Sequence, residues 1–247
     1  MSKAMDSRTG RPVVGVLGGM GPEATVLLMS RVIALTPGED DVDHVPLLVD
    51  HNPQVPSRIK ALIEGTGEDP GPVLAAMARR LAGMGAAALA MPCNTAHAYA
   101  DAIRAASDRP FLDMVALTAK RLAAMDPPVR RVGLLASPAV RIVGLYDRAL
   151  AAHGLEAVHT EAEDDLLAAI RRLKRDARDE EARVIHRRVA EELQHRGADA
   201  LLVACTEFSL IADAVPEGAR VVDALDVLAE AIVAFAQPRD AASPMPI

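Results

Sequence analysis

Residues 81–93 read LAGMGAAALAMPC, and residues 193–205 read LQHRGADALLVAC. When Cys93 is aligned with Cys205, at an offset of 112 residues, both stretches show a helix end, a glycine that closes it, an apolar strand and a final cysteine. Apolar strands between helices are typical of a parallel sheet that is covered on both faces. The repeat therefore predicts two similar lobes, each with a cysteine at the carboxyl end of a strand.

Short apolar runs alternate with helical patterns along most of the chain, which predicts the α/β class. Two of the runs also begin alike, with VGVL at 14–17 and VGLL at 132–135, at an offset of 118. We expect two pseudo-symmetric α/β/α lobes with parallel sheets, and an active site in the cleft between them. The simpler alternative is that unrelated α/β segments reuse such patterns.

Proline turns indicate the boundary between the lobes. Two such turns within residues 109–128 bracket the passage from the first lobe to the second. The apolar segment at 221–235 is expected to return to the first lobe as a closing strand and helix. We therefore assign residues 1–112 and 222–247 to the first lobe and residues 113–221 to the second.

The composition argues against several classes of function. The 247 residues are 51% hydrophobic, enough for a proper core, but only 2% aromatic and without tryptophan. Nucleic-acid binding uses aromatic platforms and a basic face, so the net charge of -7 argues against it. No apolar run is long enough for a membrane span, and the first dozen residues lack the apolar core of a secretory signal. We expect a cytoplasmic protein that acts on a small molecule.

Both cysteines of the chain occupy the same place in the repeat. In MPCNTAHA, residues 91–98, Cys93 precedes Asn94 and Thr95, either of which is expected to cap the next helix. A helix N-terminus stabilises a thiolate, which makes a cysteine a usable base or nucleophile. A single cysteine is more often an inert buried residue, but two at equivalent strand ends favour a functional pair. His97 either assists Cys93 from the same helix face or has only a structural role.

Other motifs give weaker signals. The stretch GMGPEA at 19–24, with Asp50 ending the next strand, fits a dinucleotide fingerprint, but its glycines also suit an ordinary turn. The histidines and cysteines show no metal-ligand spacing. The loop HNPQVPSR at 51–58 is stiffened by two prolines, and its Arg58 is suited to bind a carboxylate unless it is an ordinary surface arginine.

Taken together, four segments make the chain resemble the aspartate/glutamate racemase family, most closely its aspartate racemase branch. The resemblance covers nearly the whole chain, and the segments occur in the order and spacing of the family. They are VGVLGGMGPEAT at 14–25, HNPQVPSRI at 51–59, MPCNTAHA at 91–98 and CTEFS at 205–209.

This resemblance implies a cofactor-independent isomerase, with no metal, that interconverts L- and D-aspartate; glutamate is the other acidic candidate. It implies that Cys93 and Cys205 are the two catalytic bases, on opposite walls of one cleft and not bonded to each other. It also implies a homodimer. The substrate-binding residues that it implies are Met20, Gln54, Arg58, Asn94, Thr95, Ala96, Lys174 and Thr206.

The chain departs from the family pattern at two places. The family's usual lysine-plus-glycine pattern is absent around Lys174, so Lys174 and Arg175 compete for the role of the cation in the second lobe. Ala204 stands where the family commonly has a glycine before the second cysteine, which is expected to tighten the cleft slightly.

Two alternatives to a two-base racemase remain open on the sequence. One is an isomerase or amide-cleaving enzyme that uses Cys93 as a nucleophile, for which Cys205 would matter less. The other is a two-lobed protein that binds a small molecule without chemistry. Replacing each cysteine separately distinguishes the three, because racemisation needs both thiols, nucleophilic catalysis mostly one, and binding neither.

Overall fold

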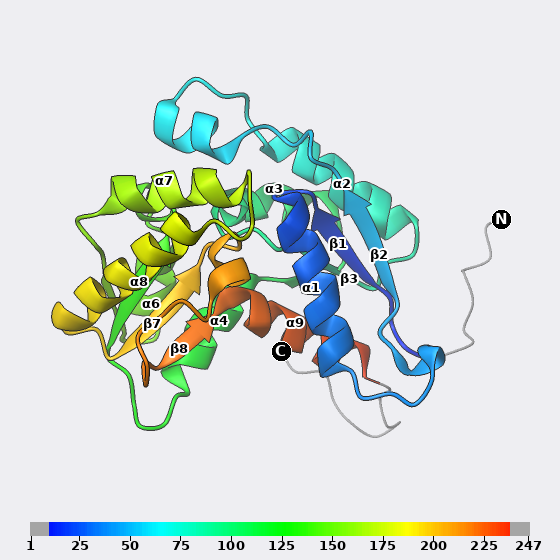
Figure 1. The fold of residues 1–247 in the computed structure, drawn as a ribbon. Coiled ribbons are helices and arrows are strands. Elements are labelled where there is room, and N and C mark those ends of the chain that lie inside the picture. Colours follow the sequence, from blue (N-terminus) through cyan, green and yellow to red (C-terminus); the bar gives the residue numbers. More distant parts are fainter. Residues whose placement is uncertain (1–9, 238–247) are drawn as a thin grey trace.

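The computed structural model describes residues 10–237, and these residues form two four-stranded parallel sheets that are flanked by helices (Figure 1). The α/β class with two similar lobes, expected from the repeat, is confirmed. Residues 1–9 and 238–247, which the sequence assigns to the first lobe, lie outside the described residues.

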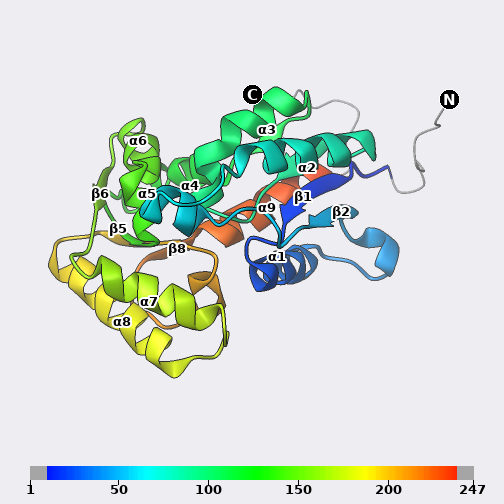
Figure 2. The same cartoon turned by 90° about the horizontal axis from the view of Figure 1, so that it is seen from above.

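The first sheet has the strand order β2-β1-β3-β4. Helices α2 and α3 lie side by side over it, as Figure 2 shows. The elements of this half are β1 (Val14–Gly18), α1 (Pro22–Leu35), β2 (Leu47–His51), α2 (Gly71–Gly83), β3 (Ala88–Ala90), α3 (Ala100–Ala106), β4 (Phe111–Leu112) and α4 (Met114–Ala123).

The second sheet repeats this order as β6-β5-β7-β8. Here α7 and α8 are the helices that lie side by side (Figure 2). The elements are β5 (Arg131–Ala136), α5 (Pro138–Ile142), α6 (Leu145–Ala151), β6 (Glu156–Val158), α7 (Glu163–Leu173), α8 (Glu180–His195), β7 (Ala200–Ala204), β8 (Val221–Asp223) and α9 (Ala224–Ala236).

Three of the four central strands are buried along their whole length, and β5 is buried except at Arg131, because helices cover both faces of each sheet. Every residue of β1, β3 and β7 is buried. Immediately after β3 and β7 the chain forms short helical turns, η3 (Thr95–Tyr99) and η4 (Phe208–Ile211). The two cysteines therefore occupy the same position in each half, between a central strand and a helical turn.

Helices α4 and α9, which follow the last strand of each sheet, pack against each other at the junction of the lobes. Both begin with an aspartate that accepts backbone N–H groups of the first turn. Asp113 accepts from Val115 and Ala116, and Asp223 accepts from Leu225. These equivalent caps fix the chain at the point where it leaves each sheet.

The expected boundary at residue 222 needs a correction. The segment at 221–223 was expected to return to the first lobe as a strand, but β8 pairs with β7 of the second sheet. Its apolar, β-branched residues complete the edge of β7 in the same way that β4 completes the edge of β3. Of the returning segment, helix α9 is the part that packs against α1.

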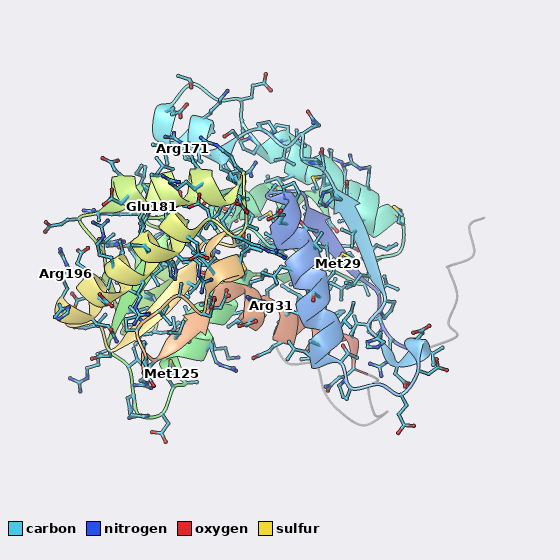
Figure 3. The ribbon with its side chains drawn as sticks, viewed as in Figure 1. Met29, Arg31, Met125, Arg171, Glu181 and Arg196 are labelled. Atoms are coloured by element: carbon cyan, nitrogen blue, oxygen red, sulfur yellow. The ribbon has the colours of Figure 1, made fainter. Side chains whose placement is uncertain are left out.

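Arg31 on α1 links the first sheet's helix layer to the end of the second sheet (Figure 3). Its guanidinium lies 2.8 Å from Asp223 and 3.0 Å from Asp226, and it also donates to the carbonyl oxygen of Ser209 at 2.9 Å. Asp223 is buried, so this ion pair is shielded from solvent on one side. The contact ties α1 to the start of α9 and to η4.

Replacing Gly19 by alanine is expected to destabilise the fold strongly. Gly19 has a φ of +91°, and an added Cβ would lie 2.4 Å from the backbone carbon of Asn52. We expect a loss of more than about 3 kcal/mol in the free energy of unfolding, or no folded protein, because strain and a backbone clash combine. Urea denaturation measures the loss.

Gly85→Ala is the matched control for this prediction. Gly85 has a similar φ of +97°, but an added Cβ would meet no atom within 4 Å. We expect a loss of only about 1 to 2 kcal/mol, from the left-handed conformation alone. Equal losses in the two variants would show that the approach of Asn52 does not restrict residue 19.

Candidate active site

Cys93 and Cys205 line the same small pocket, although 112 residues separate them in the chain. Cys93 follows β3 and Cys205 follows β7, and both are buried free thiols. The pocket has a volume of about 70 Å³. Its walls come from both lobes, with α7 and the residues after β5 and β7 facing the residues after β1, β2 and β3.

The structure brings six of the ten predicted site residues to this pocket and leaves four off its lining. Those on the lining are Met20, Arg58, Cys93, Thr95, Lys174 and Cys205. Gln54 is exposed, and Asn94, Ala96 and Thr206 are buried beside the cysteines. Of the two competing cations, Lys174 lines the pocket and Arg175 does not.

Glu207 joins Cys205 to Lys174. The Cys205 thiol donates to Glu207 Oε2 at 3.2 Å, and the Lys174 ammonium forms an ion pair with Oε1 of the same carboxylate. Glu207 is buried and Lys174 is partly exposed, so the pair reaches from the pocket towards solvent. One carboxylate thereby holds both the thiol and the ammonium group of the second lobe in place.

Two pKa shifts follow from this arrangement. Burial raises the pKa of the Cys205 thiol well above its usual range, and the charge and hydrogen bond of Glu207 raise it further. Burial alone would lower the pKa of Lys174, but the Glu207 carboxylate outweighs that effect and raises it. In the structure as it stands, Cys205 is therefore a protonated thiol beside a charged ion pair.

Arg58 is held by its own loop with part of its guanidinium left free. Its Nη1 donates to the carbonyl oxygens of Val55 and Pro56, at 3.2 and 2.8 Å. Its Nε is buried and has no hydrogen-bond partner among the described residues. An unpaired N–H of a cation on a pocket wall is suited to an anionic ligand group.

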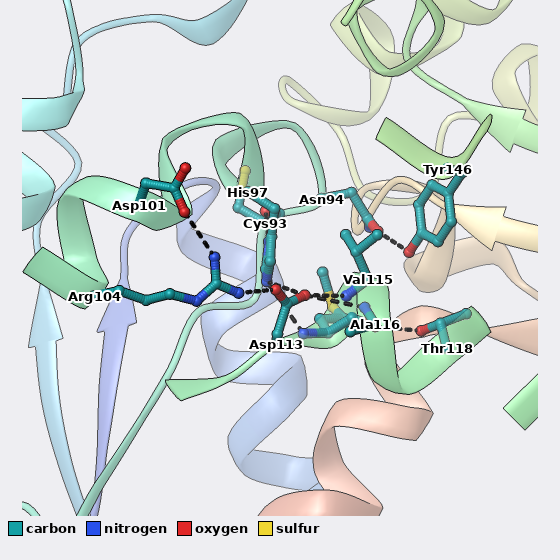
Figure 4. A network of polar contacts seen from close by, with 11 residues as sticks. Cys93, Asn94, His97, Asp101, Arg104, Asp113, Val115, Ala116, Thr118 and Tyr146 are labelled. Atoms are coloured by element: carbon teal, nitrogen blue, oxygen red, sulfur yellow. Dashed lines mark hydrogen bonds and ion pairs between the residues drawn. The ribbon is translucent and has the colours of Figure 1, made fainter. Parts of the chain in front are cut away.

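His97 has a structural role, one of the two readings that the sequence left open. Its Nδ1 is 2.8 Å from the carbonyl oxygen of Cys93, and its Nε2 accepts from the backbone N–H of Met114 at 3.2 Å (Figure 4). Both ring nitrogens are thus used, and burial lowers the pKa of the imidazole, so the ring stays neutral. His97 anchors the turn after Cys93 to the start of α4.

The expected cap on the helix after Cys93 is not formed. The chain makes a 3-10 turn there instead of an α-helix, and neither Asn94 nor Thr95 caps it with its side chain. Asn94 Oδ1 instead accepts from the hydroxyl of Tyr146, at 2.6 Å (Figure 4).

The glycines of the candidate dinucleotide fingerprint have a packing explanation. Gly19 approaches the backbone of Asn52 too closely for any side chain, and its N–H donates to Thr25 Oγ1 at 2.9 Å. Asp50, the acid that a ribose would need, forms an ion pair with Arg80 at 2.6 Å. The structure thus favours the ordinary turn over the nucleotide site.

Within residues 10–237 there is neither a cluster of metal-ligand side chains nor a helix suited to span a membrane. No three histidine, cysteine, aspartate or glutamate residues in that range are grouped so that they could hold a metal ion. No helix in the same range is long and apolar enough to span a membrane.

The pocket also contains residues that were not predicted: Ser57, Ile59, Ser137, Ile170 and Glu207. The repeat could have indicated one of them, because Glu207 is the equivalent of Thr95 at the offset of 112. No motif in the sequence points to Ile170, which reaches the pocket from α7.

Known proteins resemble this chain over nearly its full length. A broad-specificity amino-acid racemase of Bacillus subtilis, RacX, is 26% identical over 90% of this chain and 96% of its own. The structure of an aspartate racemase of Picrophilus torridus is 30% identical, with a TM-score of 0.78 over 92% of this chain and 95% of that one. A glutamate racemase of Francisella tularensis, solved with D-glutamate, shares the fold with a TM-score of 0.61, at 17% identity over 92% of this chain and 81% of its own.

The same relationship appears at the level of the family. The sequence matches the Asp/Glu/Hydantoin racemase family over residues 17–232, which include both cysteines, the Arg58 loop and Lys174. The resemblance drawn from the four sequence segments is thereby confirmed. This chain belongs to the Asp/Glu/Hydantoin racemase family.

Proposed function

We propose that this protein is a cofactor-independent racemase that interconverts L- and D-aspartate with Cys93 and Cys205 as its two acid/base groups. The observation that carries the proposal is that both cysteines line one pocket from equivalent strand ends. The aspartate racemase of Picrophilus torridus and the broad-specificity racemase of Bacillus subtilis support an amino acid as the substrate.

The two-base mechanism follows from the stereochemistry. A thiolate removes the α-proton from one face of the substrate, and the electron pair of the C–H bond stays on the α-carbon. This pair then takes the proton of the opposite thiol on the other face, and the electron pair of the S–H bond stays on that sulfur. One cysteine thereby becomes a thiol and the other a thiolate, ready for the reverse direction. Opposed positions are what two pseudo-symmetric lobes supply, since each contributes one strand end to the pocket.

The environment of Cys205 makes this cysteine the protonated member of the pair before the reaction begins. Burial raises the pKa of the Cys205 thiol, and the charge of Glu207, which accepts a hydrogen bond from it, raises this pKa further, so Cys205 begins the cycle as the acid. Cys93 then begins as the base. Glu207 is in turn balanced by Lys174, which keeps a buried carboxylate from standing unpaired next to the substrate.

The cations at the pocket suit an acidic substrate. Arg58 and Lys174 both line it, in a protein whose overall charge is negative. We assign the side-chain carboxylate to Arg58, whose Nε has no hydrogen-bond partner within residues 10–237, with Lys174 as the second cation. The homodimer and the cytoplasmic location expected from the sequence stay predictions.

Replacing either cysteine by serine tests the mechanism. We expect Cys93→Ser and Cys205→Ser each to lower racemisation of aspartate by about 10²- to 10⁴-fold, because a hydroxyl is a far weaker acid than a thiol. Chiral chromatography of the product measures the rate. A large loss in Cys93→Ser alone would indicate a nucleophilic enzyme, and full activity in both variants would contradict the two-base mechanism.

Removing the charge of Glu207 is expected to move the pH profile. We expect Glu207→Gln to lower the pKa of Cys205, so that the acid thiol is lost at lower pH and the alkaline limb of kcat/KM moves to lower pH. The exposed pair of Glu161 with Arg196 offers the control, since Glu161→Gln should leave the profile unchanged. An alkaline limb that stays in place in Glu207→Gln would show that Glu207 does not hold the Cys205 proton.

Arg58 variants test the assignment of the side-chain carboxylate. Arg58→Ala should lower kcat/KM for aspartate by roughly ten- to a hundredfold, since a charge-assisted hydrogen bond contributes about 1.5 to 3 kcal/mol. Arg58→Lys should recover only part, because a point charge cannot replace the guanidinium fork. Steady-state rates for aspartate beside alanine are the measurement. Equal losses for both substrates would mean that Arg58 does not bind the side chain.

A further inference from the structure

The turn after each cysteine is tied to the start of the helix that follows the last strand of its sheet. In the first half one side chain makes this tie. His97 contacts the carbonyl oxygen of Cys93 at 2.8 Å and accepts from the backbone N–H of Met114, at the start of α4, at 3.2 Å (Figure 4). The position of the Cys93 turn is thereby set by a single ring.

The second half builds the same tie differently, and one of its side chains comes from the first lobe. At the offset of 112 the equivalent of His97 is Ser209, whose hydroxyl donates to Oδ1 of Asp223, the cap of α9, at 2.7 Å. Arg31 extends from α1 to the same place (Figure 3). It donates Nη1 to Oδ2 of Asp223 at 2.8 Å and Nη2 to the carbonyl oxygen of Ser209 at 2.9 Å. One guanidinium thus joins the first lobe to the turn after Cys205.

These groups are shielded from water, so their bonds restrict the turn more than a surface pair would. Asp223 and Ser209 are 6% and 5% exposed, and the Arg31 side chain is 17% exposed. Asp223 Oδ1 also accepts from the backbone N–H of Leu225 at 2.9 Å, so both oxygens of the carboxylate are held. The planar guanidinium contacts a carboxylate and a carbonyl at once, which fixes the two acceptors relative to each other.

The carbonyl that Arg31 holds belongs to the same short turn as Cys205. The carbonyl oxygen of Cys205 accepts from the N–H groups of Phe208 and Ser209, at 2.9 and 3.3 Å. Glu207, which accepts from the Cys205 thiol, lies within this turn. Arg31 is not on the lining of the pocket, so its effect on a substrate there is indirect.

We infer that Arg31 is a positioning residue for Cys205: from the first lobe, it holds the turn after this cysteine and keeps the thiol aligned with the pocket. The consequence for racemisation rests on the proposed function, whereas the placement of the thiol is measured without any substrate. The tie on Cys93 does not involve Arg31, so loss of the guanidinium affects one thiol and spares the other.

The test compares how fast iodoacetamide alkylates the two cysteines of the folded full-length protein, measured by mass spectrometry. Arg31→Met removes both bonds to the turn. We expect the alkylation rate of Cys205 to rise severalfold relative to that of Cys93, because the loosened turn exposes the thiol and separates it from Glu207. An unchanged ratio would overturn the inference. An equal rise at both cysteines would also overturn it, since it would mean that the whole fold had loosened.

Arg31→Lys keeps the test decisive if Arg31→Met does not fold. Lysine retains a positive charge for Asp223, but its single ammonium cannot reproduce the forked contact with the carboxylate and the Ser209 carbonyl. The ratio should therefore rise in this variant too, by a smaller factor. A ratio equal to that of wild-type protein would show that the fork does not hold the turn.

Arg121→Met is the matched control. Arg121 forms an ion pair with Glu230 at 3.1 Å, between helices α4 and α9 at the same junction of the lobes. Its loss should leave the alkylation ratio as in wild-type protein. A rise equal to that of Arg31→Met would overturn the inference, because any lost pair at the junction would then have the same effect.

Rates of racemisation connect the inference to the reaction and separate it from the proposed function. Arg31→Met should lower kcat for aspartate by about ten- to a hundredfold with little change in KM, because Arg31 aligns a reacting thiol and does not touch the substrate. A raised KM with unchanged kcat would overturn the inference. If wild-type protein racemises no amino acid in a broad panel, the proposed function fails, and the alkylation ratio still decides the role of Arg31.

Discussion

Two buried thiols facing one pocket from the ends of equivalent strands are the constraint on which the rest of this structure depends. Parallel sheets collect the carboxyl ends of their strands at one edge, so each half of the chain can offer one cysteine to the cleft. The junction formed by α4, α9 and the Arg31 ion pairs holds these two edges together. Cys93 and Cys205 meet in the pocket because the lobes are held in this placement.

Differences between the two halves of the repeat give the two cysteines chemically different surroundings. Thr95 and Glu207 are equivalent in the two halves, yet only Glu207 is a carboxylate, and it keeps the neighbouring thiol protonated and pairs with Lys174. In the proposed mechanism, the symmetric scaffold supplies opposed positions, and the unmatched side chains determine which thiol starts as the acid. If the two thiols had identical surroundings, they would have the same pKa, and neither would hold the proton in preference to the other.

The fold and the cysteine pair could be predicted from the sequence. Periodicity, glycine spacing and the repeat identify the strands and helices, and the parallel topology then places the strand ends at one edge of each sheet. The sequence was insufficient wherever distant elements meet. The strand at 221–223 has a pattern compatible with either sheet edge, so its pairing with β7 was missed. Tyr146 and Ile170 belong to helices whose patterns report burial but not the lobe they face. Glu207 was overlooked beside Thr206, although the repeat aligns it with Thr95.

The central claim is that two separate thiols exchange protons with opposite faces of one carbon. Racemisation of L-aspartate in heavy water, stopped early and analysed for deuterium in each enantiomer, tests it most directly. The account predicts that the D-aspartate formed carries deuterium at the α-carbon while the remaining L-aspartate keeps its protium, because each thiol serves one face. Early deuterium in both enantiomers, or D-aspartate that retains the original proton, would contradict it and indicate a single base.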